Sequence, residues 1–364
     1  MSGIHPTPHV TTPPGRTAAR PHHWARLFLT GLLLWASTVL VTFFTDNTNL
    51  VPTIVLLGSF LVPATVVIRV YERYAADLGP DRILTCFGLG GVIGVLGASV
   101  LESYLLSPSV WMYVGVGLIE EAVKLAALVL VSRRLRISGL RYGLVLGATV
   151  GAGFAAFESA GYAFNAVLSI QGLSLDDLVE TEILRGVLAP VGHILWTAII
   201  GGVLFRARRG GRFRVTAPVV LTFLGVSLLH ALWDSTSGIA VWLVARTTTS
   251  DFQRALFDLG YMPNPSSEQI HLYTAYDTAG LLVVSLGGLL LAAAAAPAGA
   301  DRADPGTVPV LPGLSGHVAY DAIHFTHPSG RYPGGVWCRE TRASDAPTSG
   351  GPRCPAPSPT PCPA

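Results

Sequence analysis

Charged residues are scarce in this chain of 364 residues. Asp, Glu, Lys and Arg make up 13% of the sequence, whereas half of it is hydrophobic and the mean hydropathy is +0.51. An ordinary soluble domain carries roughly 25% charged residues, so the composition excludes that class and indicates an integral membrane protein. The arginines occur in short loops and form no single basic face, so the net charge of +2 predicts no nucleic-acid partner.

Cysteine and lysine are also rare. Four cysteines, Cys86, Cys338, Cys354 and Cys362, show neither CxxC spacing nor a disulfide framework. Of 24 basic residues 23 are arginine, and the single lysine is Lys124. A lysine in a chain that otherwise uses arginine suggests that a compact ammonium is needed at this position, and we predict that it keeps a glutamate ionised.

Long apolar runs, by contrast, are abundant. A membrane-spanning helix needs about 20 mostly apolar residues, and eight segments meet this requirement. We therefore predict an all-α, polytopic transmembrane bundle in the cell (plasma) membrane, surrounded by membrane lipid. The predicted spans are residues 27–44, 50–68, 83–101, 111–131, 142–164, 184–205, 216–235 and 275–296.

Arginine alternates between successive loops, which predicts the orientation of the bundle. The N-terminal arm and the second, fourth and sixth loops each carry at least three arginines, whereas the first and third loops carry none. The positive-inside rule then places both chain ends in the cytoplasm. We expect a flexible cytoplasmic arm over 1–26, a membrane domain over 27–296 and a Pro-rich disordered tail over 297–364. Segment 238–245 is too short to span alone, so it either extends the seventh helix or lies in the interface.

Several ionisable residues lie within the predicted spans, where each costs about 2.5–3.5 kcal/mol on insertion scales. With the predicted orientation and a rise of ~1.5 Å per residue, Glu120, Glu121, Glu158, His193 and His230 lie roughly 8–15 Å below the outer surface. Four helices are therefore expected to bring polar groups into one site near the external face. The fourth to seventh spans carry, in order, Glu120, Glu121 and Lys124; Glu158; His193; and His230 with Asp234.

The spacing of these residues supports a shared site. Glu120 and Lys124, and likewise His230 and Asp234, are four residues apart and share a helix face. Carboxylates and imidazoles at one level can bind a divalent metal or activate a water as general base. Taken singly, each pair is also consistent with a structural ion pair or hydrogen bond. A proton-coupled transporter or channel is the leading alternative, and a catalytically idle scaffold is another.

Four motifs in order resemble those of the PrsW family of intramembrane metalloproteases, which is related to the CAAX prenyl endopeptidases. "EEAVK" (Glu120–Lys124) resembles an EExxK motif, "FAAFE" (Phe154–Glu158) an FxxxE motif, and "HALWD" (His230–Asp234) an HxxxD motif. "LRGVLAPVGHILWTAIIGG", with Arg185 and His193, resembles the remaining one. The resemblance covers roughly residues 25–296.

This resemblance implies an endopeptidase that cleaves a membrane protein near the extracytoplasmic face. The substrate it implies is a single-span protein such as an anti-sigma factor, cut in a site-1-type step. The CAAX relatives usually carry EExxxR and FxxxH, whereas this chain has Lys124 and Glu158 at the corresponding ends of its motifs. That departure argues against a prenyl-protein substrate.

The resemblance also implies roles for the residues. Either Glu120 or Glu121 is the general base, with Glu121 preferred. Glu158, His193 and His230 position a metal, expected to be Zn²⁺, or the attacking water. Whether a metal is required stays open, because glutamate and histidine alone can activate a water.

Two further residues support this set. Asp234 is expected to orient His230 as an outer carboxylate, and Lys124 to pair with one of the two adjacent glutamates.

Overall fold

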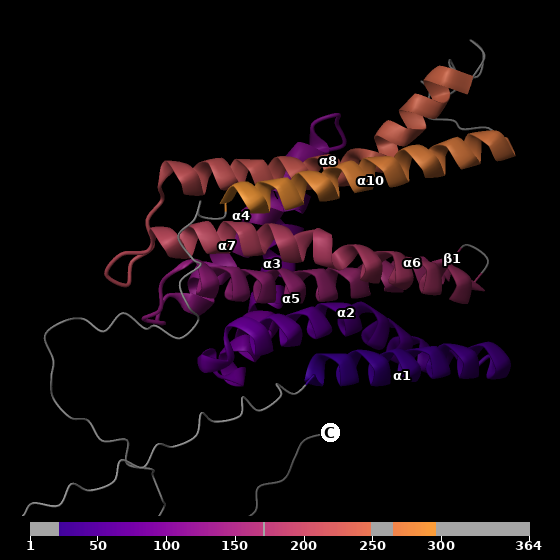
Figure 1. The fold of residues 1–364 in the computed structure, drawn as a ribbon. Helices are drawn as coiled ribbons and strands as arrows, with labels where there is room; N and C mark the ends of the chain where they lie inside the picture. Colours follow the sequence, from indigo (N-terminus) through magenta and orange to yellow (C-terminus); the bar gives the residue numbers. More distant parts are fainter. Residues whose placement is uncertain (1–21, 170–171, 249–264, 296–364) are drawn as a thin grey trace, which may run out of the picture. The chain divides into compact units, whose positions relative to one another are not determined.

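A computed structural model describes residues 22–169, 172–248 and 265–295, and nearly all of this part of the chain is helical (Figure 1). The predicted all-α helical bundle is confirmed. Most of the predicted arm and tail, residues 1–21 and 296–364, lies outside the described residues. The helices are α1 (His23–Thr45), α2 (Val51–Tyr74), α3 (Pro80–Leu105), α4 (Met112–Ser132), α5 (Leu140–Val167), α6 (Leu175–Leu188), α7 (His193–Ala207), α8 (Ala217–Thr248) and α10 (Ser267–Ala295), with 3₁₀ turns at Thr48–Leu50, Ala76–Leu78 and Ala189–Val191.

Seven segments of the described chain have the length and hydropathy of membrane spans, with α6 and α7 counted as one. The one predicted span outside these seven segments is the fourth, 111–131, which corresponds to α4; this helix packs against α3 and α8 and carries three ionisable residues. Helix α8 continues to Thr248, so segment 238–245 extends the seventh span. Two short antiparallel strands, β1 (Leu168–Ser169) and β2 (Gly172–Leu173), connect α5 to α6.

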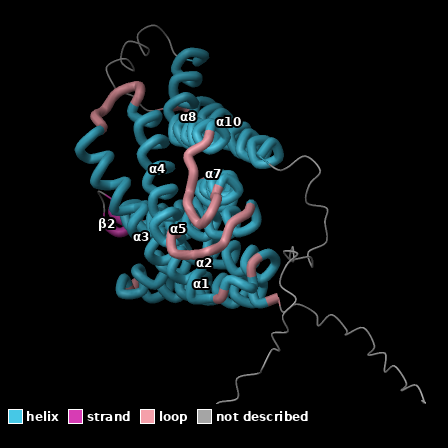
Figure 2. Tube along the Cα trace, turned by 90° about the vertical axis from the view of Figure 1, so that its left-hand side faces the viewer, coloured by secondary structure: helices cyan, strands magenta, loops and turns pink. Residues whose placement is uncertain are grey.

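Helix α5 is the most enclosed of the spans, packing against α7, α3 and α2 (Figure 2). Its glycines explain the close approach. Gly143, Gly147 and Gly151 repeat every four residues, and a Cβ on them would meet the carbonyl oxygens of Gly201, Thr197 and His193 of α7, respectively. Small residues at this spacing let two membrane helices approach with their backbones nearly in contact. The stripe fixes the height of α7 beside α5, and with it the position of His193.

The sixth predicted span, 184–205, was expected to be one helix, and the structure corrects this. Helix α6 begins earlier, where the Ser174 hydroxyl accepts a hydrogen bond from the Asp177 amide. It ends at Leu188, because Pro190 in the following turn has no N–H to continue the helix. The chain resumes at His193, which is therefore the first residue of α7 and not a mid-helix residue.

The arginine-bearing loops after α2, α4 and α7 meet at one end of the bundle. Arg141 forms an ion pair with Asp77 at 3.2 Å, joining the second and fourth loops. The buried Arg208 guanidinium donates to the carbonyls of Arg133 and Ile137 at 3.1 and 3.0 Å, joining the fourth and sixth loops. This grouping agrees with the loop pattern behind the predicted orientation, in which all three loops face the cytoplasm.

Candidate active site

Helix α4 supplies two carboxylates and one ammonium to the interior of the bundle. Glu121 and Lys124 are completely buried, and Glu120 is 6% exposed. The Lys124 Nζ atom lies 2.7 Å from Glu121 Oε1 and 3.3 Å from Glu120 Oε2, so the ammonium pairs with both glutamates. It also lies 4.3 Å from the centre of the Phe154 ring, an aromatic face that favours a cation.

His230 comes from α8 and packs directly against the glutamates of α4. Its Nδ1 atom is 3.0 Å from Glu121 Oε1, while its Nε2 atom is 3.5 Å from both Glu120 Oε2 and Asp234 Oδ2. The closest carboxylate to this imidazole is therefore Glu121. Asp234, expected from its spacing to orient the ring, makes only the longer contact, at the opposite nitrogen.

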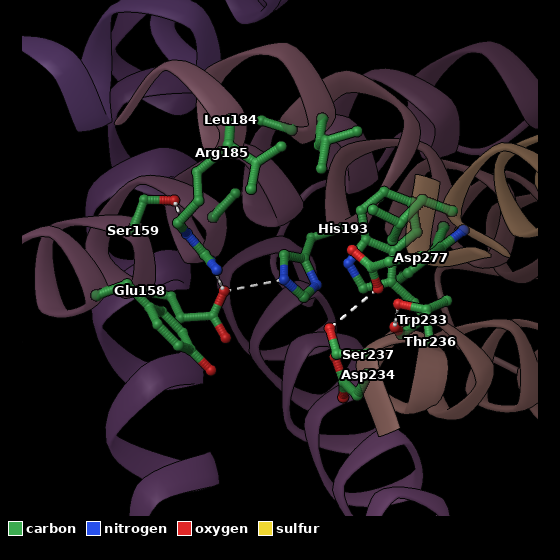
Figure 3. A pocket seen from close by; sticks show the side chains of 17 residues that line it. Glu158, Ser159, Leu184, Arg185, His193, Trp233, Asp234, Thr236, Ser237 and Asp277 are labelled. Atoms are coloured by element: carbon green, nitrogen blue, oxygen red, sulfur yellow. Dashed lines mark hydrogen bonds and ion pairs between the residues drawn. The ribbon is translucent and has the colours of Figure 1, made fainter. Parts of the chain in front are cut away.

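His193 enters from the start of α7 and faces both α4 and α5. Its Nε2 atom is 3.0 Å from Glu158 Oε2, and its Nδ1 atom is 2.9 Å from the Lys124 ammonium (Figure 3 shows the Glu158 contact). Because the ammonium can only donate, Nδ1 accepts and Nε2–H donates to Glu158. The rings of His193 and His230 are 4.9 Å apart between centres. All seven residues predicted from the sequence thus meet in one cluster.

Arg185 also belongs to this cluster, although its motif in the sequence predicted no role for it. Its Nη2 atom donates to Glu158 Oε2 at 2.5 Å, its Nε donates to Ser159 Oγ at 2.8 Å, and its guanidinium lies over the Tyr162 ring at 4.1 Å. Glu158 therefore binds Arg185 on one side and His193 on the other (Figure 3). Its position in the sequence could have identified it, because Arg185 lies inside a predicted span whereas most arginines lie in loops.

Two cavities reach the cluster, and Glu158 and Asp234 line both of them. One, of about 870 Å³ including its open part, lies between α5, α6, α8 and α10 and is lined by Arg185 and His193. The other, of about 1000 Å³ on the same measure, lies between α3, α4, α5 and α8 and is lined by Glu120. Glu121 lines neither of them. Of the two adjacent glutamates, Glu120 is the one that solvent or substrate can reach.

The donor atoms in the cluster are suited to a metal ion. Glu120, His193 and His230 each offer one ligand atom, all within 4.8 Å of one another. Two imidazoles and one carboxylate are a common donor set of catalytic zinc. Each imidazole also has one nitrogen against a carboxylate, Glu121 or Glu158, as metal-bound histidines usually do. The group differs from the predicted set in containing Glu120 in place of Glu158.

The charge balance supports the same fit. Four carboxylates, those of Glu120, Glu121, Glu158 and Asp234, surround two permanent cations, Lys124 and Arg185. Unbalanced negative charge in an apolar interior is costly, and bound protons or a divalent cation relieve it. Because the Lys124 ammonium contacts Glu120 and His193, such an ion would compete with it for these two residues.

The fold and the cluster together define a multi-pass membrane protein with a carboxylate–imidazole centre buried among its spans. Residues 80–257, which run from the start of α3 past the end of α8, match the sequence profile of the PrsW family intramembrane metalloproteases. Over these residues the chain matches the PrsW family, which confirms the resemblance read from its four motifs. No curated protein and no solved structure matches the chain. The family is one of peptidases, and its description as metalloproteases implies a metal.

Proposed function

We propose that this protein is an intramembrane endopeptidase in which Glu120 is the general base. Peptide hydrolysis needs a group that takes a proton from water as the water attacks the scissile carbonyl. Glu120 lines a cavity, so a water there can reach its carboxylate, and Glu120 Oε2 lies 3.5 Å from Nε2 of the buried His230 imidazole. This observation carries the proposal. It reverses the preference for Glu121 that the family resemblance suggested.

Glu121 is better suited to hold the site in shape. It is completely buried, and one oxygen, Oε1, receives both the Lys124 ammonium and His230 Nδ1. We assign it the role of fixing the His230 ring and balancing the charge of Lys124. On the other side of the cluster, Glu158 acts on His193 in the same manner, and Arg185 holds Glu158.

We further propose Zn²⁺ as the metal, held by the imidazoles of His193 and His230, with the Glu120 carboxylate beside them left to act as the base. The two imidazoles support zinc, which favours nitrogen ligands, and the Glu120 carboxylate oxygen lies within 4.8 Å of their ligand atoms. A bound zinc ion would polarise the scissile carbonyl and favour deprotonation of water. The chain's own groups bind the ion, orient the two imidazoles and keep lipid away from the reacting atoms.

The substrate class follows from the location of the site. The polar cluster lies among spanning helices, which supports a membrane protein as substrate, and we propose a single-span protein such as an anti-sigma factor. The grouping of arginine loops at one end supports an orientation in which cleavage occurs near the extracytoplasmic face. On α4, Glu120 is eight residues from the helix end opposite the arginine loops, about 12 Å at the rise of an α-helix.

The test is a matched pair of adjacent substitutions, Glu120→Gln and Glu121→Gln, in protein reconstituted with a single-span substrate. We expect Glu120→Gln to lower kcat by about 10²–10⁴, the usual contribution of a general base. Glu121→Gln keeps an acceptor for His230 and should lower kcat by about 10–100, as for groups that orient a ligand. The measurement is kcat and KM from the appearance of the cleaved product.

Chelation gives the second arm of the test. The zinc content of the purified protein, lost in His193→Gln and His230→Gln but kept in Glu120→Gln, reports metal binding without reference to activity. If Glu120→Gln cleaves faster than Glu121→Gln, the assignment of the general base to Glu120 is wrong. Substrate left intact by the wild-type protein, with and without zinc, would contradict the endopeptidase itself.

A further inference from the structure

Glu182 is a buried carboxylate that the proposed chemistry does not use. It lies on α6 and is 4% exposed, in a segment whose neighbours are mostly apolar. Its Oε2 atom accepts a hydrogen bond from Trp35 Nε1 of α1 at 2.6 Å, and the buried Ser59 hydroxyl of α2 also lies against the carboxyl group. A carboxyl group in such a place is costly, so its presence calls for a specific role.

Three helices converge on this carboxyl group. Trp35 reaches it from α1, and the backbone of α2 passes so close at Gly58 that any side chain there would collide with it. The profile match begins at residue 80, so α1 and α2 lie outside it. Glu182 therefore links the helix pair that precedes the matched region with a helix inside that region.

The same face of α6 leads to the active site. Leu178, Glu182 and Arg185 are separated by four and three residues and share one face of the helix. Leu178 is completely buried, and Arg185 donates to Glu158, which in turn contacts His193. The rotation and height of α6 therefore determine whether Arg185 reaches Glu158. Helix α6 is short, and the 3₁₀ turn at Ala189–Val191 separates it from α7. The position of α7 alone therefore does not fix the rotation and height of α6.

We propose that Glu182 is a positioning residue, which locks α6 against α1 and α2 and thereby holds Arg185 on Glu158. A purely adhesive contact between these helices needs no carboxyl group, since apolar side chains of similar size hold helices together as well or better. The carboxyl group adds a directional hydrogen bond to Trp35, and this bond forms at only one rotation of α6 about its axis. This inference rests on the proposed endopeptidase function.

The test compares Glu182→Met with Glu180→Met in the full-length protein. Glu180 is an exposed acid two residues away on the same helix, so the control makes the same chemical change away from α1 and α2. We expect Glu182→Met to lower kcat about 10–100-fold with little change in KM, as for groups that act through another residue. Glu182→Gln retains an acceptor for Trp35 and should restore most of the activity, and Glu180→Met should behave as wild type.

A double substitution separates positioning from general loss of stability. If Glu182 acts through Arg185, then Glu182→Met combined with Arg185→Met should be no slower than Arg185→Met alone. Multiplying losses in the double variant would overturn the inference, and so would equal kcat values for Glu182→Met and Glu180→Met.

Hydrogen exchange of residues 175–188 provides a readout that does not need cleavage. We expect faster exchange in this segment for Glu182→Met, with α3 and α4 unchanged. Unchanged exchange in 175–188 would also overturn the inference. A wild-type protein that cuts no substrate contradicts the proposed function, while the exchange comparison still decides whether Glu182 holds α6.

Discussion

Helices α1 and α5 are both long and apolar, yet they occupy opposite environments. In the most apolar window of α5, 72% of residues are buried within the protein, against 11% in α1. Hydropathy does not separate them, because α1, at 2.1, is more apolar than α5, at 1.4. In a soluble protein the more apolar helix would be the inner one.

The difference between the two helices lies in the size of their side chains. Helix α5 carries a run of glycine and alanine, "GATVGAGFAA", whereas α1 carries leucine, valine and phenylalanine. Lipid tails are as apolar as leucine, so the hydrophobic effect does not decide which helices lie inside the bundle. Close backbone packing of small residues decides it instead. The tightly packed inner helices also surround the ionisable residues, which lipid cannot solvate.

The largest effect that this comparison predicts is at Lys124. Lys124→Met removes the cation that faces Glu120 and Glu121 deep in the bundle. Breaking a buried pair from one side costs about 3–5 kcal/mol, so we expect a large fall in the free energy of unfolding together with loss of cleavage. The measurement is unfolding in mixed micelles followed by circular dichroism.

Lys124→Arg is the matched variant for charge. It keeps the positive charge but puts a larger planar group beside Phe154, and Gly94 of α3 faces the same space. We expect it to retain more stability than Lys124→Met but no normal activity. An active Lys124→Met protein would show that the inner region does not depend on charge balance.

The sequence predicted which residues meet, because ionisable groups in lipid are rare and need one another. Glu120, His193 and His230 were identified in this way. It did not predict how they pair. Spacing along one helix suggested Asp234 as the partner of His230, but Glu121 from another helix makes the shorter contact. Distances between helices depend on how α4 and α8 pack, and no pattern within either helix contains that information.

The interruption between α6 and α7 was missed for a related reason. Hydropathy stays high across 184–205, so the segment was predicted as one span, although Pro190 and Gly192 lie within it. Proline is tolerated in many membrane helices, because neighbouring groups satisfy the backbone atoms it leaves free. Here the chain turns, and the turn brings His193 to the start of a helix.

A smaller effect is expected for two glycine substitutions on α5. At Gly153 an added methyl group would meet the Phe87 carbonyl and Gly91 Cα of α3, whereas at Gly161 nothing lies within 4 Å. Gly153→Ala should therefore destabilise the protein by about 1–3 kcal/mol, the usual cost of overpacking. Gly161→Ala should be neutral or stabilising by about 0.5–1 kcal/mol, since alanine is the better helix former. Equal unfolding free energies for the two variants would mean that small residues do not set the packing of α5.

The smallest effect should come from the lipid-facing helix α1. Leu33 is 67% exposed on α1, whereas Leu128 of α4 is completely buried among protein side chains. Leu128→Ala leaves a cavity that the rigid interior cannot fill, at a cost of about 2–5 kcal/mol. Leu33→Ala leaves space that lipid tails occupy, so we expect a change within about 0.5 kcal/mol.

The two leucine variants are measured side by side by unfolding in mixed micelles. A cost for Leu33→Ala comparable to that for Leu128→Ala would show that α1 packs against protein on its outer face, and the contrast between the inner and outer helices would then be lost. A near-zero cost would restrict the structural contribution of α1 to its inner face, where Trp35 donates to Glu182. Removing that one hydrogen bond should then affect the protein more than trimming the leucines that face lipid.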